Sequence, residues 1–297
     1  IVTPNVAINP VPYAHYASVA GQVGVNNDCP AGYAVANDPV LPSSVTLCRR
    51  GIDEVVKVGR GATAFWIDRY EASVWSNVTG TDVQFGAGTI DDYPSSFPDN
   101  GQWTTPLYAV SRAGTTPEIT PSRNMTWFQA AAACAASGKR LPTGQEWLQA
   151  ARGTFDPPVG INSAAGQCNT LGSGVRANGR AARPDLVGPL PPSRFCVSAA
   201  GAENMIGNLW EWTAEWDAGL GNAMPRSTWP ASYNDDITAN ISSSANTGPS
   251  VILGLPSAVL RGGHYGDGPG AGIFATNLND SPAYSGVDKG FRCVIPR

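Results

Sequence analysis

Charged residues are scarce in this sequence, and histidine is almost absent. Charged residues make up 14% of the 297 residues, and 19 Lys and Arg against 23 Asp and Glu give a net charge of −4. No run of Lys or Arg is present, so the sequence lacks the basic stripe that neutralises nucleic-acid phosphates. We therefore expect no nucleic-acid partner.

Long hydrophobic runs are missing as well. No stretch reaches the roughly 18 apolar residues of a membrane-spanning helix, and no secretory signal pattern is present. We expect no direct insertion into a membrane. The chain begins at Ile1 without a methionine, and we expect it to be a fragment or a processed form.

Common catalytic motifs are also absent. The sequence contains no GxSxG elbow, no Walker-type phosphate loop and no HExxH helix. Carboxylates such as Asp68, Glu71, Glu215 and Asp217 are present, but their spacing alone gives no reason to pair them. We interpret the segment 68–71 as a structural set of ion pairs and hydrogen bonds.

Turn-forming residues, in contrast, are abundant. The chain has 34 Gly and 25 Pro, together with nine Trp and nine Tyr. The glycines and prolines predict many turns, whereas the aromatic residues argue against disorder. We expect a packed but loop-rich domain with short strands.

The six cysteines are widely spaced, so zinc-type pairs are missing. An even count favours disulfides, and disulfides would place the protein outside a reducing cytosol or in a thermophile. The alternative is that the cysteines are free buried thiols that pack as small apolar side chains. Sequence spacing alone leaves the pairing open among Cys29, Cys48, Cys134, Cys168, Cys196 and Cys293.

Three regions are predicted along the chain. Residues 1–28 read as an extended lead or linker, and residues 29–54 as a small segment closed by a disulfide. Residues 55–297 form the main domain. Within it, alternating apolar residues predict strands between 55 and 75, and a composition rich in Gly, Pro, Thr and Asp predicts a long surface excursion over 76–121.

Two helices give the clearest local signals. The tetrapeptides 126–129 and 143–146 each place Thr three residues before Gln or Glu, which is the pattern of a capping box. Gly138 and Gly153 then provide the stops. In the second helix three residues at helical spacing are predicted to face the core: Trp147, Ala150 and Ala151.

Four segments in this order carry a resemblance: FWIDRYEAS (65–73), GKRLPTGQEWLQAARG (138–153), NMIGNLWEWTAEW (204–216) and VLRGG…GFRCV (259–294). Together they resemble the family of sulfatase-modifying, formylglycine-generating enzymes over residues of about 55 to 297. The resemblance implies an α+β variant of the C-type lectin fold, loop-rich, with two short helices and short antiparallel strands. It also implies three disulfides: Cys134–Cys293, Cys168–Cys196 and, by what remains, Cys29–Cys48.

The resemblance further implies one structural calcium ion at residues 204–211. The implied ligands are the Asn204 side chain, the Gly207 and Leu209 carbonyls and the Glu211 carboxylate, and such oxygen ligands suit calcium. The alternative is that Asn204 and Glu211 only satisfy backbone amides in a turn. A second calcium site of the family falls at 169–188, where this chain departs from the pattern, so we do not infer it.

The chain departs from the family where the chemistry would occur. The resemblance implies a copper thiolate site with two cysteines between the RGG and GFR motifs, but the interval from His264 to Gly290 contains no cysteine. Cu(I) needs such soft ligands. A second branch of the family uses iron held by histidines, and this chain has only His15 and His264. We therefore expect no catalytic residues and no enzymatic activity.

The segment 259–294 resembles the variable region of diversity-generating retroelement proteins, which are ligand binders rewritten at template adenines. Changing the adenines of an AAC codon yields His, Tyr, Gly, Asp, Pro, Thr, Ser, Ala or Val. Every residue at the expected variable positions belongs to that set: His264, Tyr265, Gly266, Asp267, Pro269, Gly270, Thr276, Asp280, Tyr284, Val287 and Asp288. The alternative is an ordinary glycine-rich loop.

The leading hypothesis is a receptor-binding or adhesion protein on a cell surface or phage particle, hence extracellular. Its partner would be a protein or glycan on another cell or particle. We expect seven variable side chains to be exposed on one surface (His264, Tyr265, Asp267, Thr276, Asp280, Tyr284 and Asp288) above three buried ones (Phe274, Leu278 and Phe291). The alternative is an enzyme of the same family with an atypical, non-thiol active site.

Overall fold

The structure is a computed structural model of the chain. It describes residues 29–39, 41–97, 104–112, 119–155, 168–172, 174–178, 196–218 and 256–295. The predicted lead, residues 1–28, lies outside them. In the part that is described, no helix has the length and apolar character needed to cross a membrane.

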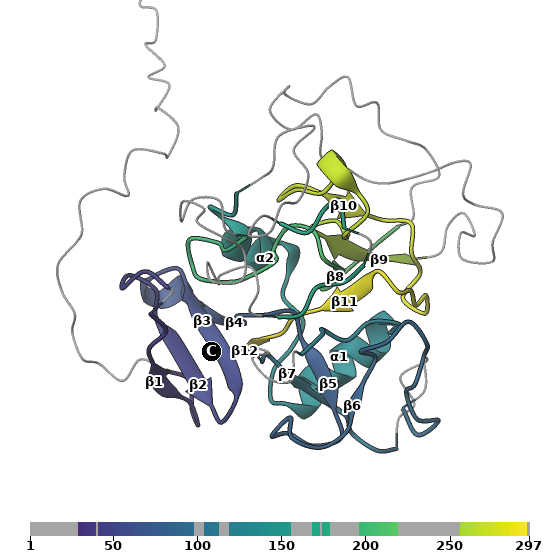
Figure 1. Cartoon of the computed structure of the whole chain (residues 1–297), viewed down its shortest axis with the longest axis horizontal. Helices are drawn as coiled ribbons and strands as arrows, with labels where there is room; N and C mark the ends of the chain where they lie inside the picture. Colours follow the sequence, from purple (N-terminus) through teal and green to yellow (C-terminus); the bar gives the residue numbers. More distant parts are fainter. Residues whose placement is uncertain are drawn as a thin grey trace, which may run out of the picture.

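The first sheet joins the two ends of the described chain (Figure 1). Its strands are all antiparallel, in the order β1 (Ala34–Ala36), β2 (Leu47–Arg50), β3 (Asp53–Val58), β4 (Phe65–Asp68) and β12 (Val294–Ile295). The predicted division at residue 54 is therefore wrong, because it falls inside β3. Residues 29–54 extend the main sheet through backbone hydrogen bonds and are no separate unit.

A small three-stranded sheet lies beside the first helix. Its order is β6 (Gln84–Phe85), β5 (Ser73–Trp75) and β7 (Tyr108–Val110). Residues 76–121 were expected to be a surface excursion, but they supply two of these strands and the buried side chains of Phe97 and Leu107. Some of the apolar residues in this turn-rich stretch explain the error, because Phe97, Leu107 and Val110 are drawn into the core.

Both predicted helices form, each with a complete capping box. In α1 (Trp127–Ala136) the Thr126 side chain accepts from the backbone of Gln129, whose side chain accepts from the backbone of Thr126. Thr143 and Glu146 do the same for α2 (Gly144–Ala151). As predicted, Trp147, Ala150 and Ala151 are fully buried. They pack α2 against β3, β4 and β12 of the first sheet.

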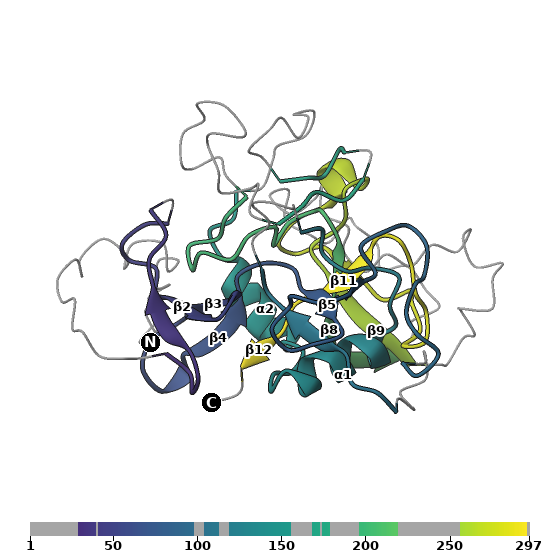
Figure 2. The same ribbon diagram turned by 60° about the horizontal axis from the view of Figure 1, so that its bottom comes forward.

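The third sheet carries the loops of greatest interest. Its order is β10 (Thr276–Asn277), β9 (Pro256–Arg261), β8 (Trp210–Ala218) and β11 (Lys289–Phe291). β11 runs parallel to β8, which departs from the expected antiparallel arrangement. The core between this sheet, α1 and the small sheet includes Trp212 and Phe291, and Figure 2 shows β8, β9 and β11 above α1. The α+β, loop-rich class is as expected.

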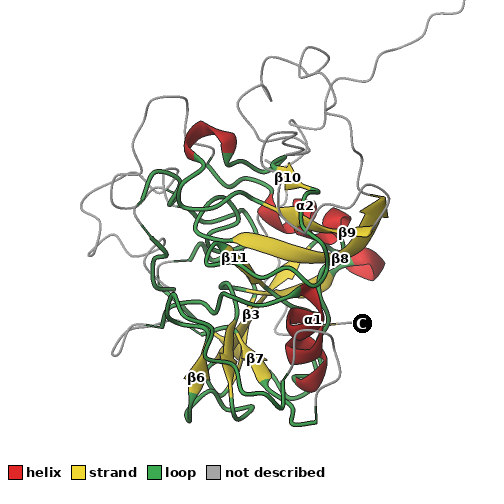
Figure 3. Cartoon of the chain, turned by 90° about the vertical axis from the view of Figure 1, so that its right-hand side faces the viewer, coloured by secondary structure: helices red, strands yellow, loops and turns green. Residues whose placement is uncertain are grey.

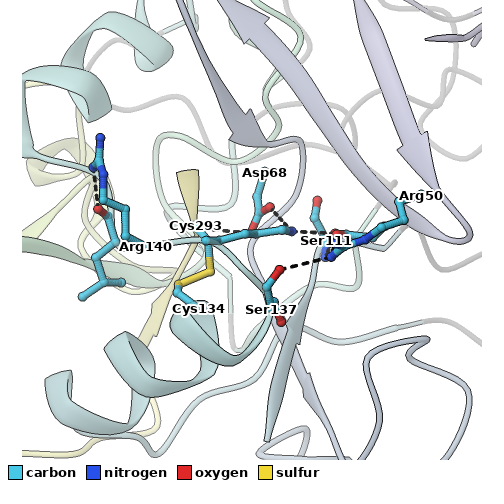
Figure 4. Close-up of a disulfide and its surroundings, with 10 residues drawn as sticks. Arg50, Asp68, Ser111, Cys134, Ser137, Arg140 and Cys293 are labelled. Carbon is cyan, nitrogen blue, oxygen red and sulfur yellow. Dashed lines mark hydrogen bonds and ion pairs between the residues drawn. A yellow bond between two sulfur atoms is a disulfide. The ribbon is translucent and has the colours of Figure 1, made fainter. Parts of the chain in front are cut away.

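Three disulfides stabilise this loop-rich fold, and their pairing is the one that the resemblance implies. Cys134, near the end of α1, is bonded to Cys293 just before β12, and the two Cα atoms are 5.7 Å apart (Figure 4). Cys293 also donates its backbone N–H to the Asp68 carboxylate at 2.8 Å. This bridge therefore fastens α1 to the first sheet.

Removing the Cys134–Cys293 bridge should destabilise the fold more than removing Cys29–Cys48. The two bridges close loops of 159 and 19 residues, for which the chain-entropy model gives about 5 and about 3 kcal/mol. The measurement is chemical denaturation of the two double Cys→Ala variants. Equal losses, or the opposite order, would show that the long loop is held by other contacts.

Candidate functional site

Ten of the eleven positions that the sequence predicts to be variable lie on two connections of the third sheet. Positions 264–270 belong to the β9–β10 connection and positions 280–288 to the β10–β11 connection, with Thr276 inside β10 itself. A 3-10 turn, η6 (Gly268–Gly270), interrupts the first connection. In Figure 3 these connections are drawn as green loops around β10 and β11, with the red turn of η6 at the top.

Two glycines start the first connection. Gly262 and Gly263 have φ angles of +93° and +82°, which disfavour other residues. A Cβ atom on Gly263 would lie 2.5 Å from the Cβ of Ala271, and one on Gly262 would lie 3.0 Å from the Met205 carbonyl oxygen. The backbone needs glycine here, so these two residues belong to the fixed frame.

His264 and Asp267 shape the turn that follows. The Asp267 carboxylate accepts the His264 backbone N–H at 2.7 Å and lies 3.1 Å from His264 Nε2. The Nδ1 atom of His264 accepts the backbone N–H of Gly266 at 3.1 Å. The Tyr265 ring packs edge-on against the imidazole. This turn is therefore organised by two of its own variable side chains.

Lys289 connects the second group of variable residues. Its Nζ atom lies 2.8 Å from the Asp288 carboxylate, 3.5 Å from the Asp280 carboxylate and 5.2 Å from the centre of the Tyr284 ring. The Asp288 carboxylate is also 4.0 Å from His264 Nε2. The two connections thus meet at Asp288, and the structure brings six variable side chains together: His264, Tyr265, Asp267, Asp280, Tyr284 and Asp288.

The expected exposure of these residues is correct only in part. Tyr284 is exposed, and His264, Tyr265, Asp267 and Asp288 are partly exposed. Asp280, however, is only 8% exposed, because it turns toward Lys289 and accepts from the Asn277 side chain at 3.2 Å. We therefore correct this position from a surface contact to a buried counter-ion.

The remaining residues with a predicted exposure lie in or next to β10 and β11. Thr276 is partly exposed and hydrogen-bonds to Arg261 at 2.7 Å, which places it at the sheet. Phe291 is fully buried as predicted. Phe274 and Leu278 are only partly buried, so the prediction for these two was wrong. Both lie in loops around the two-residue strand β10, which is too short to cover them.

Beneath the loops, Arg292 is the centre of a buried polar network. Its guanidinium pairs with both oxygens of the Glu211 carboxylate and donates to the carbonyls of Asp68 and Glu203, at 3.1 and 2.8 Å. Trp147 Nε1 donates to the same carboxylate at 2.7 Å. Arg292 and Glu211 are 0% and 1% exposed. Glu211 is therefore a structural partner of Arg292.

This arrangement does not suit Glu211 as a calcium ligand. Both of its oxygens already accept from Arg292 or Trp147, and a guanidinium in direct contact repels a cation. The predicted ligands include no other formal charge. Asn204 does adopt the left-handed backbone of a tight turn, with φ +55°. Calcium binding stays a prediction, without support from the position of Glu211.

Two buried carboxyl groups have raised pKa values. Burial, reinforced by the nearby Glu211 carboxylate, raises the pKa of Glu71 well above its usual range, although Asn208 and the Leu209 backbone donate to it. Burial also raises the pKa of Asp68 to about 6, against the opposing effect of the Lys139 ammonium. Lys139 lies 2.6 Å from Asp68 and 2.7 Å from Asp53. These groups hold segments of the fold together.

Sequence reasoning did not identify the roles of Lys289, Arg292 and Lys139. All three lie inside recognised motifs, but a motif does not say where a long side chain reaches. The sequence shows few Lys and Arg residues, but it does not show which of them are buried among carboxylates.

The cysteines leave no thiol for metal chemistry. All six are in disulfides, so no cysteine of the chain is free. Over the described ranges, no group of three or more His, Cys, Asp or Glu side chains is arranged to hold a metal ion.

Comparisons with known families and proteins agree on the kind of domain. The family model described as "Sulfatase-modifying factor enzyme 1-like domain" matches residues 51–297. The hercynine oxygenase of Mycolicibacterium thermoresistibile is 38% identical over 100 residues, which is 33% of this chain and 21% of that protein. The "Inactive C-alpha-formylglycine-generating enzyme 2" of Bos taurus is 37% identical over 98 residues, 32% of each chain. The chain therefore spans between a fifth and a third of the length of these relatives.

Two solved structures align with most of this chain. Treponema denticola variable protein 1 aligns with a TM-score of 0.45 and 19% identity, covering 85% of this chain and 99% of that one. The P3c variant of the major tropism determinant aligns with a TM-score of 0.41 and 22% identity, covering 82% and 52%.

Replacing Lys289 by Met should destabilise the protein in a pH-dependent way. Burial raises the pKa of Asp280, and Lys289 opposes the rise, so its removal raises that pKa further. The pKa of Asp280 is then higher in the folded state than in the unfolded state. The ionised carboxylate therefore destabilises the fold at pH values above the folded-state pKa, and this cost disappears below the unfolded-state pKa. We expect a loss of about 3 kcal/mol at neutral pH that shrinks as the pH falls toward about 4.

The control is Lys57→Met, which removes the same charge from a partly exposed lysine over the Trp66 ring. Its effect should not vary with pH over this range. Denaturation curves at several pH values decide the matter, and a pH-independent loss in Lys289→Met would contradict the role given to Asp280.

Proposed function

Because the chain belongs to the family of sulfatase-modifying factor enzyme 1-like domains, we propose that it uses the family's fold to bind a macromolecular ligand. The relatives that it matches include an oxygenase and a protein named as inactive. Membership alone therefore does not decide between catalysis and binding. The arrangement of residues 261–292 favours binding.

One observation carries this proposal. The variable positions lie on connections outside a frame whose glycines, buried arginine and disulfide fix the backbone. Loops on a rigid scaffold can change their side chains at little cost to folding. Tyr265 and Tyr284 add contact area with little rotamer entropy, as tyrosines do in antibody loops. The codon set of the eleven positions points the same way.

The chemistry of the cysteines supports a non-catalytic role. The family's copper thiolate chemistry needs two free cysteines, and here each cysteine is already oxidised in a disulfide. The atypical, non-thiol enzyme remains the second candidate, because the matched relatives include oxidising enzymes.

The disulfides also support an extracellular location, since such bonds persist outside a reducing cytosol. We propose display on a cell surface or a phage particle, with a protein or glycan of another cell or particle as the ligand. The two tyrosines and the carboxylates of Asp267 and Asp288 provide the mixed apolar and polar contact that such ligands need.

The combined substitution Tyr265→Ala, Tyr284→Ala and Val287→Ala should abolish ligand binding and leave the melting temperature nearly unchanged. These side chains are partly exposed, Tyr284 to 37% and Val287 to 38%, so truncation opens no buried cavity. Phe291→Ala, in contrast, should cost about 3–5 kcal/mol, because that ring is fully buried. Binding is measured by flow cytometry on a panel of intact bacteria. Unfolding of the triple variant, or unchanged labelling by it, would contradict the proposal.

The enzymatic alternative predicts that the purified protein converts a cysteine-containing peptide to an aldehyde. The binding proposal predicts that the mass of the peptide stays unchanged. Formation of the aldehyde would reverse our ranking of the two. The coding region offers a second test: a near-copy of the 259–294 coding sequence, with adenines at the variable codons, should lie beside a reverse transcriptase gene.

A further inference from the structure

Exposed apolar side chains gather around the proposed binding surface. Among the residues that the structure describes, eight large apolar side chains are exposed, and four of them lie on or next to the variable connections. Tyr284 and Val287 are variable positions. Ile90 and Leu171, which are 77% and 43% exposed, come from segments far away in the sequence. Such clustering at one surface is typical of an interaction site.

Arg123 and Asn124 join the Ile90 loop to the second variable connection. The Arg123 guanidinium donates to the carbonyls of Gly88 and Val287, at 2.7 and 3.5 Å. Asn124 donates its side chain to the Gly88 carbonyl and its backbone N–H to the Gly286 carbonyl, at 3.2 and 3.0 Å. Figures 1 and 2 show the yellow loop before β11 beside the dark-blue loop after β6. The two loops form one surface.

Leu171 lies against the first variable connection. The backbone N–H of Gly268 donates to the Thr170 carbonyl at 2.7 Å. A Cβ atom on Gly268 would lie 3.0 Å from the Cδ2 atom of Leu171. Because His264 links Asp267 to Asp288, Leu171 and Ile90 stand at the two ends of one series of contacts that runs through the variable residues.

The charges on this surface are arranged by depth. Asp91 and Asp92 are exposed, and Asp267 and Asp288 are partly exposed. Two cations among these loops are buried, with Arg123 9% and Lys289 6% exposed, whereas Arg261 beside Thr276 is partly exposed. Asp91 and Asp92 therefore face the solvent on the side where Arg123 is buried.

We propose that Ile90 and Leu171 are fixed contacts of the binding surface, flanking the variable residues, and that the ligand is a protein surface with Lys or Arg around apolar side chains. This inference rests on the proposed function. Protein interfaces combine an apolar centre with a polar rim, and acidic groups favour basic partners. Ile90 and Leu171 would hold different ligands in the same orientation. Substitutions at the variable positions between them would then decide which ligand is bound.

The experiment is selection of a displayed library of random peptides on the full wild-type chain. Enriched peptides should carry Lys or Arg next to apolar residues. Ile90→Ser and Leu171→Ser should each weaken their binding about tenfold or more. Val35→Ser and Val78→Ser change side chains that are 55% and 43% exposed on other segments, and binding should be unchanged. Melting curves confirm that each variant is folded.

Charge is tested in parallel. Asp91→Asn and Asp288→Asn should weaken the same peptides and flatten the dependence of their affinity on salt. Asp82→Asn is the matched control, since Asp82 is exposed in the turn between β5 and β6.

Each other outcome overturns the proposal in a distinct way. Peptides that depend on Tyr284 and Val287 but not on Ile90 or Leu171 would leave the proposed function standing and remove the fixed flanks. Peptides insensitive to all four residues would contradict the proposed function as well. Enrichment without basic residues, no enrichment, or binding to an array of glycans through Tyr284 alone would exclude a basic protein partner.

Discussion

A single buried guanidinium connects the segments on which the binding surface depends. Arg292 binds both oxygens of Glu211 on β8 and the backbone carbonyls of Asp68, at the end of β4, and of Glu203. A buried ion of this kind is costly to desolvate and must keep its partners. Because Arg292 follows β11 directly, the same contacts fix where the second variable connection ends. The Cys134–Cys293 bridge fastens the next residue to α1.

The freedom of the loops follows from that constraint. Gly262 and Gly263 set the start of the first connection by backbone conformation, and the contacts between His264 and Asp267 shape the turn that follows. The second connection is less free. Lys289 is buried and reaches two variable carboxylates, and a sequence that lost both would leave its ammonium without a counter-ion. Positions 280 and 288 therefore depend on each other, whereas Tyr284 and Val287 are unconstrained by charge.

Short sequence motifs correctly predicted the features that depend on only a few neighbouring residues. The two capping boxes identified both helices, because each cap needs only four consecutive residues. The disulfide pairing came from a family resemblance, since spacing alone left it open. What failed depended on long-range contacts. Asp280 is buried because Lys289 approaches it from nine residues away, and the segment before residue 54 belongs to the main sheet because it pairs with β3.

The loop that contains Ile90 is also placed by long-range contacts that the sequence does not reveal. Nothing in residues 86–93 indicates that they lie beside residues 286–288, and it is the contacts of Arg123 and Asn124 with both segments that bring them together. The central claim is that the frame holds the fold and the exposed loop positions do not. Its most direct test compares two displayed libraries by protease resistance. One randomises Tyr265, Gly266, Pro269, Tyr284 and Val287, and the other randomises five buried frame positions: Met205, Trp212, Leu260, Phe291 and Val294. We predict that most members of the first library stay resistant and that most of the second do not. Similar losses in both would contradict the account.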